Sequence, residues 1–453
     1  MNKTTKVLLA LGVIIVLLYP GIAWVTGMAV ESRLQHNEQQ ALAKSPYVTV
    51  VKREYHRGVY RSTAITTFSL HIPPRAAGAA AALLSSFTLT VTSNIQHGPL
   101  LGLHGVGLAE IDSTIVVPPA LQKEVSAVIG SQPIAQLHSI VGLLGSTTGE
   151  LTSPAFSLPL PNGANLVWGG LTASGTASRN QASWSGKLSA PRLLVQGPHG
   201  RFELTGVEYS GSHQKAFDDL YLGGGTFTIE RLDGNGPRPG SDFSLQRIAV
   251  TTSSKADGDF FDMRVDIAMD AAKIAAVQLT NVMYSQGFEH VHGPSFASLV
   301  RAVRTAQLQS AGNQAQLQAG IQDAFRQYGG TLLAHDPVID IRQVSFSMPE
   351  GSFLLSAKIS APGLGPADLQ MPALVMALRT HGQVTADLRV DNGLVQKLLT
   401  MSGSNPKVAT QLTSFEQQGY LTAGPAAVST HFEFSNGRMT LNGRPFPPAP
   451  PVN

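Results

Sequence analysis

The 453-residue chain contains no cysteine. This absence excludes disulfide bridges, thiolate metal ligands, a cysteine nucleophile and an anchor built on a lipid-modified cysteine. It is compatible with an oxidising compartment but does not identify one.

Charged residues are also scarce. Asp, Glu, Lys and Arg make up 13% of the chain, whereas an average soluble domain has about 25%. The formal net charge is +3, and the basic residues are dispersed along the sequence. A nucleic-acid-binding protein concentrates Lys and Arg on one face, so this class is not favoured. Low charge with 43% hydrophobic residues also excludes a disordered chain.

Signatures of catalytic and metal sites are lacking. His290 and His292, beside Glu289, would share a face if the segment were a strand, but the His-Glu-x-x-His spacing is absent and no third ligand is nearby. A polar loop is the preferred interpretation. Ser295 lacks the second glycine of a nucleophile elbow and is expected to cap a helix. We therefore expect no catalytic residue, no metal site and no cofactor, and predict that the chain is not an enzyme.

One long apolar run is present. Residues 7–30 contain no charged side chain, and about 20 apolar residues suffice to cross a bilayer. Lys3 and Lys6 precede the run, so the positive-inside rule predicts a single transmembrane helix with a cytoplasmic N-terminus. The alternative is a cleaved signal peptide with an apolar core at 7–18. Both interpretations export residues 45–453.

The exported part is dominated by alternation of apolar and polar residues. In FTLTVTSNI, from residue 87, Phe and Leu alternate with Thr, which indicates a half-buried strand. Near the C-terminus, Asn436-Gly437 suits a two-residue type I′ turn. That turn predicts a hairpin in which Phe434 faces Met439 and Phe432 faces Leu441.

Helices are predicted in fewer places. The clearest are 134–145 after Pro133, 295–330 ending at Gly329-Gly330, 392–402 and 407–419. About fifteen strands with these helices predict a β-rich α+β fold, with one N-terminal transmembrane helix followed by a large curled antiparallel sheet and a few packed helices. The predicted organisation is a cytoplasmic stub at 1–6, a transmembrane helix at 7–30, a juxtamembrane helix at 31–44 and a β-rich body at 45–453.

Several short motifs occur in a fixed order after the apolar run: YHRGVY (55–60), QHGPL (96–100), LLAHDPVIDI (332–341) and FSNGRMTLNGRPF (434–446). Together they resemble the YdgA-like family of bacterial envelope proteins. The resemblance implies a single-pass inner-membrane protein with a periplasmic β-rich body and no catalytic residues. The motif residues that we expect to have structural roles are Tyr55, His56, Arg57, Gly58, His97, Gly98, Pro99, Asn436 and Gly437.

The segment around Arg57 is interpreted as a joint between the N-terminal helix and the sheet. Gly58 would form a bulge at the head of a strand at 58–72, and Arg57 would donate to unpaired carbonyls. The alternation of apolar and polar residues along the body would give the sheet one apolar face, which could hold lipid or a protein partner. We therefore expect a non-enzymatic binding or scaffold protein of the envelope. The alternative is an envelope hydrolase with residues not recognisable in the sequence. The oligomeric state is left open.

Overall fold

The computed structural model describes residues 20, 23–28, 31–32, 48–70, 87–116, 125–130, 132–160, 163–198, 200–218, 220–236, 240–310, 313–369, 373–401 and 406–446. The chain divides into two compact units. Unit 1 comprises Met1–Val195 with Arg304–Leu317, and unit 2 comprises Gln196–Val303 with Gln318–Asn453.

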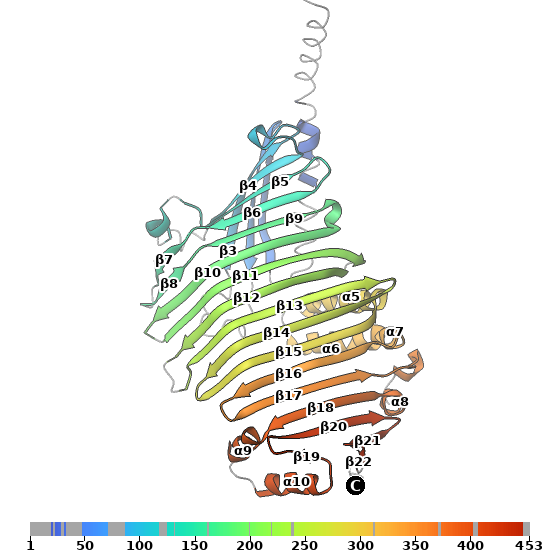
Figure 1. The fold of residues 1–453 in the computed structure, drawn as a ribbon. Helices are drawn as coiled ribbons and strands as arrows, with labels where there is room; N and C mark the ends of the chain where they lie inside the picture. Colours follow the sequence, from blue (N-terminus) through green and yellow to red (C-terminus); the bar gives the residue numbers. More distant parts are fainter. Residues whose placement is uncertain are drawn as a thin grey trace, which may run out of the picture. The chain divides into compact units, whose positions relative to one another are not determined.

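Unit 1 is an antiparallel sheet (Figure 1). Its strands are β1 (Val48–Arg57), β2 (Arg61–Leu70), β3 (Phe87–His97), β4 (Ala109–Val116), β5 (Ala135–Val141), β6 (Thr147–Ser153), β7 (Phe156–Pro159), β8 (Asn165–Trp168), β9 (Leu171–Ala177) and β10 (Ser183–Gly197), the last up to Val195. Strands β1 to β6 pair in sequence order, and β9 pairs with both β6 and β10. Strands β7 and β8 form a hairpin.

The core of unit 1 lies where small and branched side chains of β2, β3 and β4 meet. Ala64, Ile95 and Ala109 are buried, and Tyr55 and Ile111 pack around them. These side chains come from alternate positions, as the two-residue period of a half-buried strand requires.

The helix predicted at 134–145 is wrong, because this segment contains strand β5. Strand β5 pairs with β4 on one side and with β6 on the other. Hydrogen bonding to both neighbours overrides the helical spacing of its apolar residues.

Unit 2 contains β11 (Gly200–Phe217), β12 (Leu220–Asn235), β13 (Phe243–Asp257), β14 (Phe260–Ile274), β15 (Val277–His292), β16 (Val338–Met348), β17 (Gly351–Ser360), β18 (Gln383–Asp391), β19 (Thr422–Ala423), β20 (Ala427–Ser435), β21 (Arg438–Leu441) and β22 (Arg444–Pro445). From β11 to β18 each strand pairs antiparallel with the next, and the sheet continues through β20, β21 and β22. The predicted C-terminal hairpin is confirmed, because Phe434 pairs with Met439 and Phe432 with Leu441.

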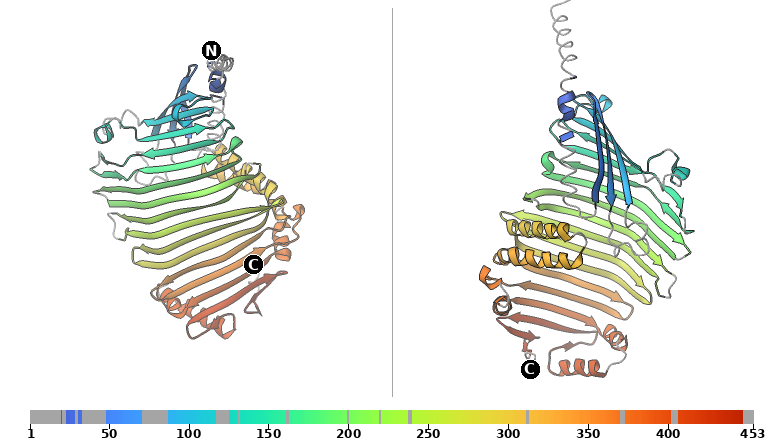
Figure 2. Two further views of the ribbon diagram at one scale, coloured as in Figure 1. Left: turned by 45° about the horizontal axis from the view of Figure 1, so that its top comes forward. Right: turned by 180° about the vertical axis from the view of Figure 1, so that it is seen from behind.

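After β15 the chain forms the helices α5 (Gly293–Ser310), α6 (Gln314–Ala324), α7 (Gly330–Leu333), α8 (Ala373–His381), α9 (Asn392–Met401) and α10 (Pro406–Gln417). The parts of α5 and α6 that belong to unit 2 lie against one face of its sheet (Figure 2). The pair Gly329-Gly330 does not end the helical region as predicted, since a π-helical turn at Phe325–Gly329 leads into α7. Ser295 lies in the first turn of α5 and not at its N-cap, because the helix begins at Gly293.

The predicted fold class, a β-rich α+β body behind a transmembrane helix, is wrong. The structure is mostly antiparallel sheet, and the sheet is open. Among the described residues no helix is long and apolar enough to cross a membrane. Within the predicted span, residues 23–28 are helical and pack on other residues of unit 1. Ala23 is buried there, and Thr26 Oγ1 donates to the Gly98 carbonyl at 3.2 Å. The stub at 1–6, the remainder of the span apart from Pro20, and residues 33–44 lie outside the described residues.

Candidate functional site

A continuous row of large apolar side chains crosses the unit 2 sheet. Residues directly opposite each other on paired strands point to the same face, and the pairings connect one residue on each of seven consecutive strands. The row consists of Phe227 (β12), Val250 (β13), Ile267 (β14), Tyr284 (β15), Val344 (β16), Leu355 (β17) and Leu388 (β18). We refer to it as the apolar row.

The apolar row is accessible to solvent. None of its seven members is buried, and Phe227 and Ile267 remain 37% and 38% exposed. Soluble proteins seldom leave contiguous apolar surface of this extent open unless it binds something.

Further apolar side chains extend the same face on one side of the apolar row. Two residues along from the row, Ile248 pairs with Met269, and Phe346 stacks on Phe353 with ring centroids 5.1 Å apart. These residues are half-buried. The apolar face is therefore at least two residues wide along β13, β14, β16 and β17.

Helices α5 and α7 cover one end of this face. Phe261, on the same side of β14 as Ile267, is 2% exposed and packs edge-on against Phe296 of α5 with centroids 5.4 Å apart. Leu332 of α7 belongs to the same cluster. Gly293 allows α5 to approach this closely, since a Cβ there would lie 2.4 Å from the Phe217 ring. Moving away from this cluster along β14, burial gives way to the half-exposed apolar row.

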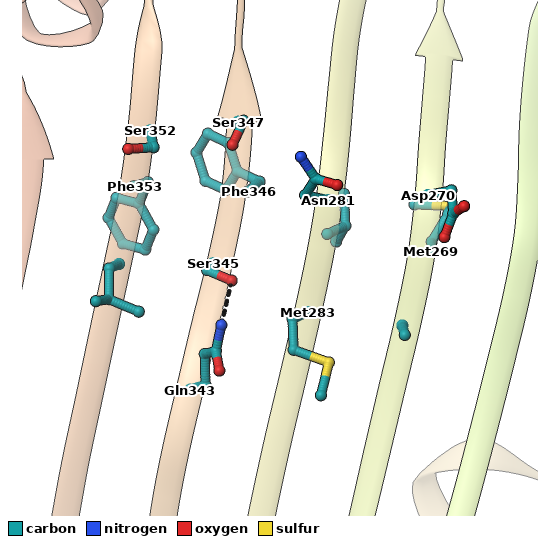
Figure 3. A pocket seen from close by; sticks show the side chains of 13 residues that line it. Met269, Asp270, Asn281, Met283, Gln343, Ser345, Phe346, Ser347, Ser352 and Phe353 are labelled. Atoms are coloured by element: carbon teal, nitrogen blue, oxygen red, sulfur yellow. Dashed lines mark hydrogen bonds between the residues drawn. The ribbon is translucent and has the colours of Figure 1, made fainter.

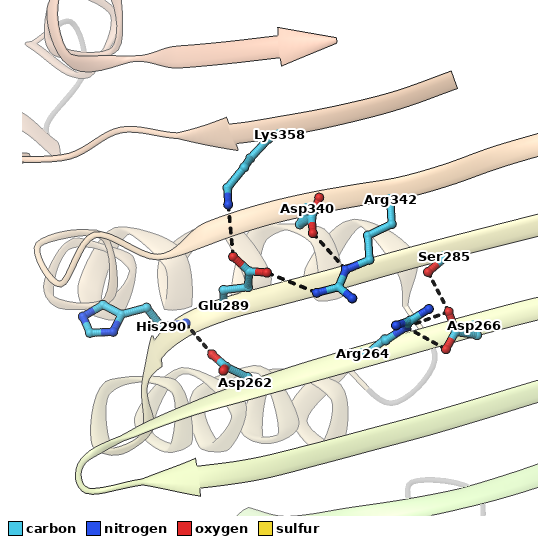
Figure 4. A network of polar contacts seen from close by, with 9 residues as sticks. All are labelled: Asp262, Arg264, Asp266, Ser285, Glu289, His290, Asp340, Arg342 and Lys358. Carbon is cyan, nitrogen blue, oxygen red and sulfur yellow. Dashed lines mark hydrogen bonds and ion pairs between the residues drawn. The ribbon is translucent and has the colours of Figure 1, made fainter. Parts of the chain in front are cut away.

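The opposite face of the same strands is charged (Figure 4). Arg342 bonds to Asp340 at 2.9 Å and to Glu289 at 3.3 Å, and Lys358 reaches Glu289 at 3.3 Å. The basic side chains of these pairs are exposed, and the acidic ones are half-buried. Because exposed ion pairs contribute little stability, their main effect is to keep this face hydrated.

Asp266 on the charged face is held by two neighbouring side chains. Burial raises its pKa, but hydrogen bonds from Ser285 and Arg264 outweigh burial and leave the pKa below its ordinary value. Ser285 donates to Asp266 at 2.6 Å, and Arg264 pairs with it at 2.8 Å. Asp266 is therefore ionised at neutral pH, and the sheet is amphipathic, with one apolar and one charged face.

A shallow hollow of about 460 Å³ lies over β14 to β17 (Figure 3). Thirteen residues line it: Ala268, Met269, Asp270, Asn281, Val282, Met283, Gln343, Ser345, Phe346, Ser347, Ser352, Phe353 and Leu354. Only Asp270 among them is ionisable, and it pairs with Arg247. The lining thus mixes methionine and phenylalanine with serine and amide groups.

His290 and His292 lie at the end of strand β15, so the predicted polar loop is wrong. The His292 ring stacks on His335 at 3.8 Å between centroids, and its Nδ1 lies 2.7 Å from Ser295 Oγ. His290 instead stacks on Phe260. Burial, followed by the neighbouring His335, lowers the pKa of His292.

The structure brings two of the predicted motifs together in unit 1. Tyr55 packs in the core, and burial raises the pKa of its hydroxyl. Gly58 does not form the predicted bulge within a strand. It lies in the turn between β1 and β2, where its N–H donates to the Arg61 carbonyl at 2.9 Å. His56 is exposed on β1.

Among the described residues, the partners shown for Arg57 are side chains and not the predicted carbonyls. Its Nε lies 3.2 Å from Glu31 Oε2, and its guanidinium stands 5.0 Å above the Trp24 ring. The segment therefore does contact the described N-terminal helical residues, through an ion pair and a cation–π contact.

His97 is the buried polar residue of this region, at 1% exposure. Its Nδ1 and Nε2 lie 2.9 Å from the Val59 carbonyl and from Ser62 Oγ. A carbonyl can only accept, so Nδ1 donates to the Val59 carbonyl, while Nε2 and the Ser62 hydroxyl share a second hydrogen bond. Gly98 and Pro99 follow in the loop to β4, where the Gly98 N–H donates to the Leu108 carbonyl at 2.8 Å.

Asn436 and Gly437 form the β20–β21 turn of unit 2 and make no common site with the unit 1 motifs. The apolar row was not found from the sequence, although each strand shows the required alternation. The missing information was the register between strands, which joins one residue from each into a surface.

The family model of a bacterial protein of unknown function, DUF945, matches residues 1–449. The chain belongs to this family. It is also 22% identical over 498 residues to Protein YdgA of Escherichia coli (strain K12), an alignment that covers 98% of this chain and 95% of that protein. The resemblance to a YdgA-like family is thereby confirmed. No solved structure matches the chain.

Proposed function

We propose that this protein acts in the bacterial cell envelope and binds the acyl chain of a lipid along the apolar row, without catalysing a reaction. The observation that carries the proposal is the row itself, which runs from Phe227 to Leu388 without a buried member. An apolar ligand would remove these side chains from water. This burial would stabilise the complex by about 25 cal/mol for each Å² of apolar surface covered.

The dimensions of the row favour a long ligand. Seven strands enclose six spacings of about 4.8 Å, or roughly 29 Å in total. The hydrocarbon core of a bilayer is about 30 Å thick and contains two layers of acyl chains, so the row is long enough to hold one acyl chain over its whole length. A compact ligand would instead need an enclosed cavity that buries most of its surface.

The position of the row favours lipid over a peptide strand. A peptide that extends a sheet bonds to the unpaired backbone of an edge strand. The apolar row lies on the face of strands such as β14 and β16, whose two edges are already paired. Side chains, and not backbone groups, are what this surface offers.

The envelope location rests on the N-terminal sequence. Lys3 and Lys6 precede the uncharged run at 7–30, a pattern typical of segments that direct export. A reporter that fluoresces only in the cytoplasm, fused after Asn453, should stay dark in bacteria. Fluorescence from an intact fusion would contradict export.

The binding proposal is tested by native mass spectrometry of the full chain incubated with palmitate or a diacyl phospholipid. Leu355→Glu places a carboxylate in the middle of the row, where contact with an acyl chain would desolvate it at a cost of several kcal/mol. We expect it to weaken binding about tenfold or more.

The adjacent Leu354→Glu is the matched control. Leu354 points to the charged face, is 43% exposed and pairs with Arg389, so this variant should bind like the parent. Equal loss in both variants, or no lipid on the parent chain, would overturn the proposal.

A further inference from the structure

A second cluster of polar side chains lies in unit 1, on the strands that follow the His97 loop. His104 is at the end of a short 3₁₀ turn, η2 (Gly102–His104), Glu110 is on β4, and His138 is on β5. Within the described residues this is the one group whose His and carboxylate atoms could share a metal ion, and the three atoms all lie within 4.8 Å of one another.

The separations between the three candidate ligand atoms are close to those between the ligands of a metal ion. His104 Nδ1 lies 2.9 Å and His138 Nδ1 4.0 Å from Glu110 Oε1. Ligands at about 2.0–2.2 Å from a tetrahedral zinc ion are separated from each other by about 3.3–3.5 Å. Shifts of about 1.5 Å or less, within the reach of side-chain rotation, bring the three atoms to these separations.

More carboxylates surround the cluster. Asp112 Oδ1 lies 2.7 Å from His138 Nδ1, and Glu150 on β6 pairs directly opposite His138. The three carboxylates are Glu110, Asp112 and Glu150. These acidic side chains favour the approach of a cation.

We propose that His104, Glu110 and His138 bind one divalent transition-metal ion of the zinc type, with Asp112 beside it as a second carboxylate. Two imidazoles and a carboxylate suit Zn²⁺, whereas Ca²⁺ and Mg²⁺ prefer oxygen ligands throughout. The His104 and His138 side chains are 50% and 36% exposed, and Glu110 is 12% exposed. An ion can therefore enter from solvent onto a carboxylate that is already held in place.

The metal would fasten the β3–β4 loop to the sheet. His104 is carried by this loop, and Glu110 and His138 by two paired strands. The same loop begins at Gly98, whose carbonyl accepts from Thr26. Binding would thus brace the part of unit 1 that contacts residues 23–28.

The test is calorimetric titration of the full, untagged chain with zinc chloride in a non-chelating buffer. We expect one ion per chain, and a weakening of about tenfold or more in His104→Ala, His138→Ala and Glu110→Gln. Glu110→Gln keeps the size of the side chain, so a loss in that variant reports on the ligand and not on packing. The variants should also lose the visible absorption that Co²⁺ acquires when it substitutes at a nitrogen–oxygen site.

His431→Ala is the matched control. His431 Nδ1 lies 2.7 Å from Asp387 Oδ1 across two strands, the same spacing as in the His138–Asp112 pair, but this pair belongs to no three-residue group among the described residues. Its removal should leave zinc affinity unchanged. Absence of zinc binding by the parent chain would mean that His104, Glu110 and His138 only contact one another and hold no metal. Binding that survives His104→Ala and His138→Ala would place zinc elsewhere. Either result overturns the proposal.

Discussion

The β20–β21 turn shows what a single residue contributes. Asn436 and Gly437 have positive φ angles of 50° and 72°, as a type I′ turn requires. This feature could be predicted because its cause is local: two adjacent residues set the turn, and the turn sets the register of Phe434 and Phe432.

Gly437→Val should therefore destabilise unit 2 by about 1–3 kcal/mol, because a β-branched residue resists positive φ. A Cβ there would also lie 3.3 Å from Arg379 Cγ. Chemical denaturation measures the cost. Asn436→Gly, which relieves the neighbouring positive φ, should change stability by about 0.5 kcal/mol or less. An unchanged unfolding midpoint for Gly437→Val would contradict the assigned turn.

His97 and Arg57 show where residue-level reasoning from sequence stops. The sequence indicates that both are polar residues near a turn. Their partners, however, lie in segments that are distant along the chain. Arg57 meets Glu31, and His97 meets Val59 and Ser62. The buried polar residue is therefore His97 and not Arg57, which the sequence favoured.

His97→Ala should lower the free energy of unfolding by about 1–3 kcal/mol, because it leaves the Val59 carbonyl and the Ser62 hydroxyl without their partner. Arg57→Ala should cost about 1 kcal/mol or less, because it removes a partly exposed ion pair. Hydrogen exchange on β2 and β3 of the full chain separates the two effects, with exposed His56→Ala as the control. A larger effect from Arg57→Ala than from His97→Ala would contradict this ranking.

At the scale of elements, the strands were largely predictable and the segment 134–145 was not. Ile134, Leu137 and Val141 fall at helical spacing, yet the segment contains β5. A short apolar run is compatible with either structure, and the decision comes from β4 and β6, which supply hydrogen bonds on both sides. The same error concealed His138, because a strand, and not a helix, places it opposite Asp112.

The junction of β15 and α5 carries a testable pH dependence. Burial and then His335 lower the pKa of His292 in the folded protein below its ordinary value of 6.5, while Asp259 opposes this. The unfolded chain therefore binds the proton more tightly, so the free energy of unfolding is highest above the ordinary value and falls as pH drops below it.

Denaturant titrations at about pH 7.5 and about pH 5.5 should show this decrease in the parent chain. His292→Gln should show a smaller one, since the remaining titrating groups are unchanged. An identical decrease in the two proteins would contradict the assignment to His292.

At the scale of the whole molecule, the sequence predicted a strand-rich body and the correct family. It did not predict the apolar row, the surface that we propose binds an acyl chain. Each strand contributes only one member to the apolar row, and the row exists because registers match across seven strands. Such non-local pairing cannot be derived from the alternation within any one strand. The charged network around Arg342 on the opposite face depends on register in the same way.

The central claim is that an acyl chain occupies one face of the unit 2 sheet and not the other. Because the chain has no cysteine, a single introduced cysteine carries a fluorescent label without background. Leu355→Cys and Leu354→Cys are adjacent on β17 and point to opposite faces. The direct measurement is quenching of the label by a fatty acid that bears a spin label on its acyl chain. We expect saturable quenching at position 355, competed by unlabelled palmitate, and little at position 354. Equal quenching at the two positions, or quenching at 354 alone, would contradict the account.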